Sequence, residues 1–251
     1  MGGGEKVLIA FHGYGNNAEW SQAFEAIIGR EYTIFSIDLP HHGDSKWEKD
    51  KILKINELND LIKAILKEQN IEKVSLLGYS LGGRVCLCAI EQLPEMIDRV
   101  LLLAPDGLVF NSLYYFVTRN YIGKKLFRSF LKHADRYLPL VKWAKERKLI
   151  DAAKYKFVMQ YLENDESRKF LQQVWPGTSE LVPNHKRLNT LIRLHEIPID
   201  IFMGRHDKII KPEYAERFKG NVSTVRVHVV NKGHKVLDGD TIGLMARCLL
   251  D

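Results

Sequence analysis

The stretch GYSLG at residues 78–82 constrains the fold of this chain more than any other segment. It follows an apolar run, Val74–Leu77, and precedes a helical pattern, Arg84–Leu93. This order predicts a strand, a sharp turn and a helix, with Ser80 at the apex. Glycine is needed on both sides of the turn because a side chain there would collide with it. The turn therefore presents the Ser80 hydroxyl above a helix N-terminus, where backbone N–H groups favour a developing negative charge.

Two later loops supply an acid and a base. An apolar run, Ile199–Met203, leads into the stretch GRHDKIIKP, which contains Asp207. An alternating run, Val225–Val230, leads into the stretch NKGH, which ends at His234. Each of these groups follows a predicted strand, and together with a serine they form the set that activates a nucleophile. Asp106 also follows a strand end, but Asp207 fits the pattern better, and Asp106 is interpreted as a turn residue.

The motifs resemble those of the α/β-hydrolase fold family of serine hydrolases, and the resemblance spans nearly the whole chain. Four motifs agree in order and spacing: HGYG at 12–15, DLPHHGDS at 38–45, GYSLG at 78–82, and GRHDKIIKP at 204–212 followed by GH at 233–234. The resemblance implies that Ser80 is the nucleophile, His234 the general base and acid, and Asp207 the carboxylate that orients the histidine. It also implies that the backbone N–H groups of Tyr14 and Leu81 form the oxyanion hole.

Alternating apolar and helical patterns predict an α/β fold with a mostly parallel sheet of about six strands and helices on both faces. The predicted strands are Val7–Phe11, Thr33–Ile37, Val74–Leu77, Val100–Leu103, Ile199–Met203 and Val225–Val230. The family often has two strands before the first motif, but only six residues precede Val7, so a trimmed sheet is expected. His41 stands where the family usually has glycine, and we expect the local turn to differ there.

Between residues 109 and 194 the strand pattern stops and helical periodicity recurs. The predicted helices are Tyr114–Lys132, Leu140–Lys148, Ala152–Glu163 and Glu166–Val174. The resemblance implies that residues 109–194 form a helical cap, or lid, and that residues 1–108 and 195–251 form the α/β-hydrolase core. The segment 109–194 carries 17 Lys and Arg residues against 7 Asp and Glu, and 14 of the 25 Phe, Trp and Tyr residues. The net charge of +6 therefore arises in the predicted cap.

A basic, aromatic-rich cap predicts a small-molecule acyl substrate with an apolar body and an anionic group. The segment 114–128 interleaves aromatic and basic residues, which is also typical of helices that lie on an anionic membrane surface. The simpler interpretation, which we favour at this point, is that apolar residues pack inward while Lys and Arg solvate the outer face. Nucleic acid is not predicted as a partner, because no recognised binding motif accompanies the charge.

Arg84 lies four residues after the nucleophile and is interpreted either as an ion-pair partner on the surface or as an anion-binding group at the pocket floor. The stretch GYSLGGR at 78–84 is similar to the elbow of the menaquinone-pathway lyases that make succinyl-hydroxycyclohexadiene carboxylate, and of the C–C bond hydrolases of aromatic breakdown. In those families the arginine is implied to hold a substrate carboxylate. Three functions stay open: a serine esterase, a C–C bond hydrolase or lyase acting on a carboxylate, and a non-catalytic ligand receptor.

The chain offers no pattern for a metal or for a membrane span. The histidines outside the motifs have no ligand-like spacing, and the predicted chemistry needs no cofactor. No apolar run reaches the length of a membrane span, and the N-terminus lacks a signal-peptide pattern. The odd number of cysteines, Cys86, Cys88 and Cys248, predicts buried thiols in a reducing cytoplasm.

Overall fold

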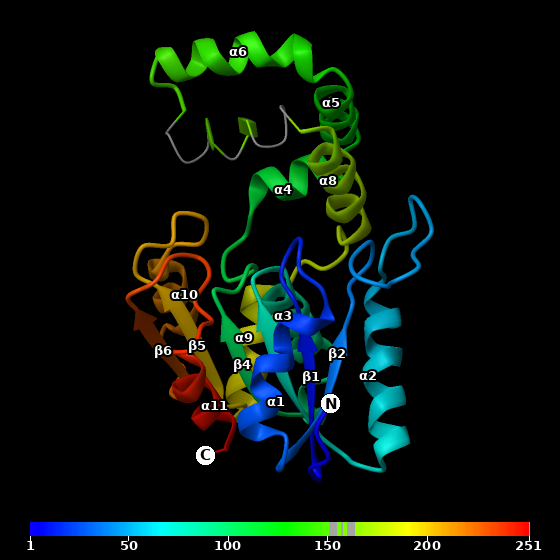
Figure 1. Cartoon of the computed structure of the whole chain (residues 1–251), viewed down its shortest axis with the longest axis vertical. Coiled ribbons are helices and arrows are strands. Elements are labelled where there is room, and N and C mark those ends of the chain that lie inside the picture. The colour runs from blue at the N-terminus through cyan, green and yellow to red at the C-terminus, as the bar shows by residue number, and fades with distance from the viewer. Residues whose placement is uncertain (151–154, 157, 160–163, 251) are drawn as a thin grey trace. The chain divides into compact units, whose positions relative to one another are not determined.

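The computed structural model describes residues 1–150, 155–156, 158–159 and 164–250, and it contains two compact units. The core unit comprises Met1–Ser45, Lys54–Phe110 and Leu181–Asp251. The helical unit comprises Lys46–Leu53 and Asn111–Glu180. Figure 1 labels most of the helices and strands of the two units.

The core unit is built on one sheet of six parallel strands in the order β2-β1-β3-β4-β5-β6. The strands are β1 (Lys6–Phe11), β2 (Tyr32–Ile37), β3 (Val74–Tyr79), β4 (Ile97–Leu103), β5 (Ile199–Gly204) and β6 (Val225–Val230). The central strands are almost continuous apolar runs because helices cover both faces of the sheet. The predicted α/β class, the six strands and their parallel arrangement are confirmed.

Helices cover both faces of this sheet (Figure 1). On one face, α1 (Gln22–Ile28) and α11 (Ile242–Leu250) pack with alternate strand side chains into a single buried cluster. On the other face, α3 (Leu81–Gln92) contacts α2 (Ile55–Gln69) and α9 (His185–Leu194). The helix α10 (Pro212–Lys219) packs against β5 and β6, and two short 3-10 helices span Ala18–Ser21 and Pro94–Met96.

The strand order reverses beside β1, which lies between β2 and β3. In open α/β sheets such a reversal leaves a crevice at the carboxyl ends of the strands. Phe11, the last residue of β1, is paired with Gly78 near the end of β3, so the loops that follow the two strands start side by side. The loops after β5 and β6 leave the same edge, because Gly204 is paired with Val230.

The helical unit contains α4 (Ser112–Arg119), α5 (Tyr121–Lys132), α6 (Ala134–Glu146) and α8 (Asp165–Gly177). Trp175 on α8 contacts both α4 and α5. Its carbonyl accepts a hydrogen bond from the Tyr114 hydroxyl at 3.1 Å, and its ring stacks on Phe127 with centroids 5.5 Å apart. Gly123 allows α4 and α5 to approach closely, since a Cβ there would lie 2.0 Å from the carbonyl oxygen of Phe116.

The prediction of one helix over Tyr114–Lys132 is wrong, because the chain breaks at Asn120. The backbone of Asn120 is extended (φ −77°, ψ 138°), and its side chain accepts hydrogen bonds from the N–H groups of Ile122 and Gly123. An asparagine in this position ends one helix and caps the next. The spacing of apolar residues does not show whether the asparagine side chain caps a new helix or lies within a continuous one.

Other boundaries also shift. The helix predicted over Leu140–Lys148 is α6, which begins earlier, at Ala134. Most of the helix predicted over Ala152–Glu163 lies outside the described residues. The helix α9 belongs to the core unit, although it falls inside the predicted cap at residues 109–194. Every element described between those limits is a helix.

Candidate active site

The turn at Ser80 has the strained geometry that the motif predicts. Ser80 lies between the end of β3 and the start of α3, with φ 48° and ψ −111°. A Cβ on Gly78 would lie 2.7 Å from the carbonyl oxygen of Gly82, and a Cβ on Gly82 would lie 1.9 Å from that of Phe11. The Ser80 N–H donates to the carbonyl of Leu103 at 2.9 Å, which fixes the turn to the neighbouring strand β4. Packing therefore holds a backbone conformation that costs about 1–3 kcal/mol.

The structure brings Ser80, His234 and Asp207 into one hydrogen-bonded chain. His234 Nε2 lies 3.0 Å from Ser80 Oγ, and His234 Nδ1 lies 2.8 Å from Asp207 Oδ2. A carboxylate only accepts hydrogen bonds, so Nδ1 carries the proton and Nε2 presents its lone pair to the serine hydroxyl. The imidazole is thus held in the tautomer that can take a proton from Ser80.

Asp207 is fixed by its own loop after β5. Its side chain has no exposed surface, and its Oδ1 accepts hydrogen bonds from the N–H groups of Ile209 at 2.8 Å and Ile210 at 3.0 Å. The other oxygen, Oδ2, is left for His234. Sequence analysis did not find the two N–H donors, although an aspartate two or three residues before them is a typical Asx-turn pattern.

Two glycines bring the acid loop and the base loop together. A Cβ on Gly204 would lie 1.9 Å from the carbonyl oxygen of Gly233, the residue before the histidine. The N–H of His206 donates to the carbonyl of Lys232 at 2.9 Å across the same gap. Gly204 is therefore a steric requirement for the approach of His234 to Asp207.

Tyr79 is a site residue that sequence analysis missed. Its ring packs on the His234 imidazole with centroids 5.5 Å apart and on Trp20 at 5.7 Å. Burial, with the charge of Asp207 as a smaller contribution, raises the pKa of Tyr79 to about 12. The phenol is therefore neutral and acts as a wall beside the imidazole. The sequence feature that could have identified Tyr79 as a site residue is its position directly before Ser80 in the GYSLG motif.

The loop after β1 passes directly beside Ser80. A Cβ on Gly13 would lie 2.7 Å from the Tyr79 ring and 3.3 Å from Ser80 Cβ. The fully buried His12 fixes this loop: its Nε2 accepts the N–H of Leu39 at 3.0 Å, so its Nδ1–H donates to the carbonyl of Gly13 at 2.8 Å. Burial lowers the pKa of His12, which is consistent with this neutral form.

A second loop, residues 38–45, packs against the first. The Asp38 carboxylate accepts the N–H groups of Ala18 at 2.7 Å and Asp44 at 2.9 Å. Burial lowers the pKa of His42 to about 4, and the nearby His12 and His41 act in the same direction. His41 has φ 65°, so it adopts the left-handed conformation that the family's glycine would favour.

The two predicted oxyanion donors, Tyr14 and Leu81, follow the ends of adjacent strands. Tyr14 lies in the turn after β1, and Leu81 directly follows Ser80 as the first residue of α3. The first N–H groups of a helix have no carbonyl partner within it, so the Leu81 N–H is available at the helix N-terminus. Tyr14 follows Gly13, whose position beside Ser80 brings this turn to the site.

Arg84 lies beside Asp106 and is buried, so the expectation that it pairs on the surface is wrong. Its Nε lies 3.3 Å from Asp106 Oδ2, and the residue is only 6% exposed. Gly107, with φ 91°, lies against the arginine, since a Cβ there would be 3.1 Å from its side chain. Asp106 contacts Arg84, a pairing that sequence analysis did not predict, and the N–H of Gly107 in its own turn, while Asp207 contacts the histidine.

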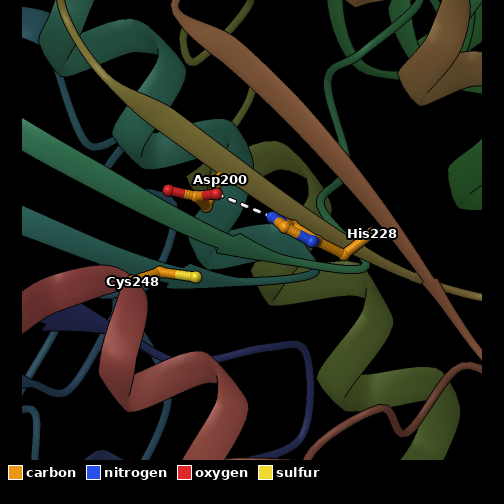
Figure 2. A group of neighbouring side chains, drawn as sticks. All are labelled: Asp200, His228 and Cys248. Atoms are coloured by element: carbon orange, nitrogen blue, oxygen red, sulfur yellow. Dashed lines mark hydrogen bonds and ion pairs between the residues drawn. The ribbon is translucent and has the colours of Figure 1, made fainter. Parts of the chain in front are cut away.

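One group of possible metal ligands gathers within the described residues, at the far end of the sheet. Figure 2 shows Asp200 on β5, His228 on β6 and Cys248 on α11, with one donor atom each within 4.8 Å of the others. The Asp200 carboxylate already accepts Arg226 Nε at 2.8 Å and Nη2 at 2.6 Å, and His228 Nε2 at 2.7 Å. The guanidinium neutralises the carboxylate, so we interpret the group as an ion-pair cluster that joins β5 to β6.

The buried thiols predicted from the sequence are confirmed: Cys86, Cys88 and Cys248 are free and buried. Burial raises the pKa of Cys88 to about 12 and raises that of Cys86 as well. These thiols are therefore packing residues rather than nucleophiles. Within the described ranges, the helices are all too short or too polar to cross a membrane.

Comparison with known proteins finds a match to one protein family and to several relatives. Residues 6–240 match the profile of a family described as alpha/beta hydrolase fold. A putative esterase/lipase 2 of Mycoplasma genitalium is 24% identical over 221 residues, which cover 82% of this chain and 79% of the relative. The 2-succinyl-6-hydroxy-2,4-cyclohexadiene-1-carboxylate synthase of Citrobacter koseri is 40% identical over 110 residues, or 42% of this chain and 41% of that relative.

A solved structure agrees along almost the whole chain. The meta-cleavage product hydrolase from Pseudomonas fluorescens IP01 superposes with a TM-score of 0.65 and 17% identity, covering 99% of this chain and 92% of the other. At such low identity the likeness shows the fold alone.

Proposed function

This chain belongs to the alpha/beta hydrolase fold family, and we propose that it is a serine hydrolase that cleaves a carboxylic ester or a related acyl substrate. The hydrogen-bonded chain from Asp207 through His234 to Ser80 carries the proposal, with links of 2.8 Å and 3.0 Å. The likeness to a putative esterase/lipase over most of the chain supports it.

In this mechanism His234 Nε2 takes the hydroxyl proton as Ser80 Oγ attacks the acyl carbonyl. Asp207 stabilises the imidazolium that forms, without taking its proton. The imidazolium then protonates the leaving alcohol, and an acyl-enzyme is left on Ser80. Water attacks this ester with the same histidine as base, which releases the acid and restores the serine.

The negative charge that develops on the carbonyl oxygen needs donors that are already in place. We assign this role to the backbone N–H groups of Tyr14 and Leu81, which follow the carboxyl ends of β1 and β3. Removing one donor of an oxyanion hole typically costs a factor of about 10²–10³ in kcat. The positive end of the α3 dipole adds to the stabilisation.

The test is ester turnover by the Ser80→Ala variant beside the parent chain. We expect the variant to lose hydrolysis of p-nitrophenyl esters and to lose labelling by a fluorophosphonate probe, with an unchanged melting temperature. Full esterase activity in the Ser80→Ala variant refutes the proposal. Absence of a Ser80 adduct in the parent chain, across probes of different size, favours a non-catalytic ligand receptor.

A second candidate keeps the same groups and changes the reaction to C–C bond hydrolysis or lyase chemistry on a carboxylate-bearing substrate. The 40% identity to the Citrobacter koseri synthase over 110 residues favours it. Arg84 would then hold the substrate carboxylate, which requires that this carboxylate compete with Asp106 for the guanidinium. Assays of carboxylate-bearing diketones and of that synthase's substrate beside simple esters separate the two reactions.

The remaining features of the proposal concern the substrate and its surroundings. Residues 111–180 of the predicted cap act as a lid, whereas α9 belongs to the core unit, and the excess of basic and aromatic residues in segment 109–194 suits a substrate with an apolar body and an anionic group. No cofactor takes part, because the serine, the histidine and the backbone donors supply every proton and charge that acyl transfer needs. Three free thiols suit a reducing cytoplasm.

A further inference from the structure

The exposed side of α4 and α5 is set by packing inside the helical unit. Tyr114 and Phe127 turn inward to Trp175, and Thr118 and Leu131 are also buried. The opposite sides of the two helices are left to solvent. We name the exposed residues on these sides the α4–α5 surface; they are Leu113, Tyr115, Phe116, Arg119, Tyr121, Ile122, Lys124, Lys125, Leu126, Arg128 and Lys132.

Large apolar side chains are concentrated on this surface. Of the 17 large apolar side chains that are exposed in the described residues, six lie on this surface: Leu113, Tyr115, Phe116, Tyr121, Ile122 and Leu126. On α5, Tyr121 is 80% exposed, Ile122 62% and Leu126 54%. Ile122 and Leu126 are one helical turn apart, so they form a continuous aliphatic stripe. Soluble proteins rarely leave such side chains together in water without a binding role.

A stripe of positive charge runs beside the aliphatic one. Lys125, Arg128 and Lys132 follow Tyr121 at helical spacing along the same side of α5. The sequence contains no acidic residue between Asp106 and Asp135, so nothing in this segment offsets the charge. The simple interpretation that the apolar residues of segment 114–128 all pack inward is therefore wrong for Ile122 and Leu126.

We propose that the α4–α5 surface docks on a lipid bilayer that carries anionic headgroups. Lys125, Arg128 and Lys132 would lie at the headgroups, and Ile122 and Leu126 would enter the boundary with the acyl chains. Tyr121, a phenol beside an aliphatic stripe, suits the interface between the two. A nucleic acid or another polyanion would match the charge but would leave the aliphatic stripe in water. The proposal is independent of the reaction that the serine performs.

The test uses the full chain with the Ser80→Ala change, so that turnover cannot alter the lipid. Co-sedimentation is measured with vesicles of phosphatidylcholine and with vesicles that also contain phosphatidylglycerol. We expect binding to the anionic vesicles only, and release as salt rises. Equal binding to both vesicle types, or binding to neither, overturns the proposal.

Three sets of substitutions locate the contact. The triple change Lys125→Gln, Arg128→Gln and Lys132→Gln is expected to weaken vesicle binding roughly tenfold or more. The double change Ile122→Ser and Leu126→Ser is expected to weaken it by a similar factor. The matched control, Lys63→Gln, Lys67→Gln and Lys73→Gln, removes three exposed lysines of the core unit and should bind like the parent.

Each pattern of results decides the matter. If the control variant loses as much vesicle binding as the Lys125, Arg128 and Lys132 variant, only the net charge of the protein matters, and the proposal is overturned. If the Ile122 and Leu126 variant binds as well as the parent, the protein adsorbs by charge alone, which also overturns the proposal. Circular dichroism and melting temperature check that every variant is folded. If light scattering finds a dimer that the Ile122→Ser and Leu126→Ser changes convert to a monomer, a second copy covers the surface and the bilayer proposal is refuted.

Discussion

The ring of Tyr79 lies against the ring of His234, with centroids 5.5 Å apart and planes inclined by 36°. The histidine is thereby confined on three sides, by Ser80, by Asp207 and by this aromatic wall. A base that is held in one orientation pays less entropy when the substrate arrives.

The first prediction concerns this wall. Tyr79→Ala should lower kcat/KM roughly tenfold, because an aromatic contact of this kind is worth about 0.5–1.5 kcal/mol. Tyr79→Phe should keep most activity, because the phenol is neutral at working pH with a pKa raised to about 12. Steady-state ester hydrolysis and the rate of fluorophosphonate labelling measure both effects. A larger loss in Tyr79→Phe than in Tyr79→Ala would assign the role to the hydroxyl instead.

The second prediction distinguishes the two aspartates that follow strand ends. Asp207→Asn should lower kcat by about three to four orders of magnitude, because an amide favours the wrong imidazole tautomer. Asp106→Asn should leave the hydrolysis of a neutral ester nearly unchanged, because Asp106 contacts Arg84 and its own turn. Comparison of kcat for the two variants is the measurement. Similar losses in both would contradict the assignment of the acid.

The third prediction concerns acid stability. Below pH 6.5 the unfolded chain protonates His42, whereas the folded chain resists protonation until about pH 4. The contribution of this residue to stability is therefore fully present above pH 6.5 and is lost as the pH falls toward 4, by about 3 kcal/mol in all. The free energy of unfolding, measured with urea at several pH values in this window, should fall less steeply with decreasing pH for His42→Gln than for the parent. The same dependence of unfolding free energy on pH in His42→Gln and in the parent would contradict the assignment of this effect to His42.

The fourth prediction concerns the approach of the acid and base loops. Gly204→Ala places a methyl group 1.9 Å from the carbonyl oxygen of Gly233, so the loop that carries His234 must shift. We expect more than a tenfold loss of activity and a stability loss of about 1–3 kcal/mol. Gly239→Ala meets nothing within 4 Å and should behave like the parent. Activity retained in Gly204→Ala would show that the loop tolerates the shift.

The fifth prediction tests whether charge selects the substrate. If the Lys and Arg side chains of segment 109–194 attract an anionic group on the substrate, turnover of an anionic ester at low concentration should fall as the salt concentration rises. A neutral ester of the same size should be little affected. Initial rates over a salt series for the two esters give the answer. The same salt dependence for both would reduce the basic residues to a solvated surface.

The sequence predicts most of this architecture because the relevant signals are local. Apolar runs identify all six strands, and the chain order of Ser80, Asp207 and His234 predicts the three groups that the structure brings together. What sequence analysis misses depends on contacts between distant residues. The pairing of Arg84 with Asp106 and the stacking of Tyr79 on His234 arise only when separate loops meet.

The helical segment was harder to predict for a different reason. Asn120 fits both a continuous helix and a break, and the capping hydrogen bonds that decide between them leave no trace in periodicity. The same segment also shows where a pattern misleads: Ile122 and Leu126 have helical spacing, yet they lie on the exposed side.

The last strand, β6, pairs with β5 along its whole length, and its Arg226 and His228 also contact Asp200 on β5. The loop after β6 brings His234 to a serine 154 positions earlier in the chain. During synthesis the nucleophile's turn leaves the ribosome long before its base does. If Ser80 is the proposed nucleophile, a nascent chain that ends before His234 has the hydroxyl without the base that activates it. The contacts of Arg226 and His228 with Asp200 therefore help to hold in the sheet the strand that leads to this histidine.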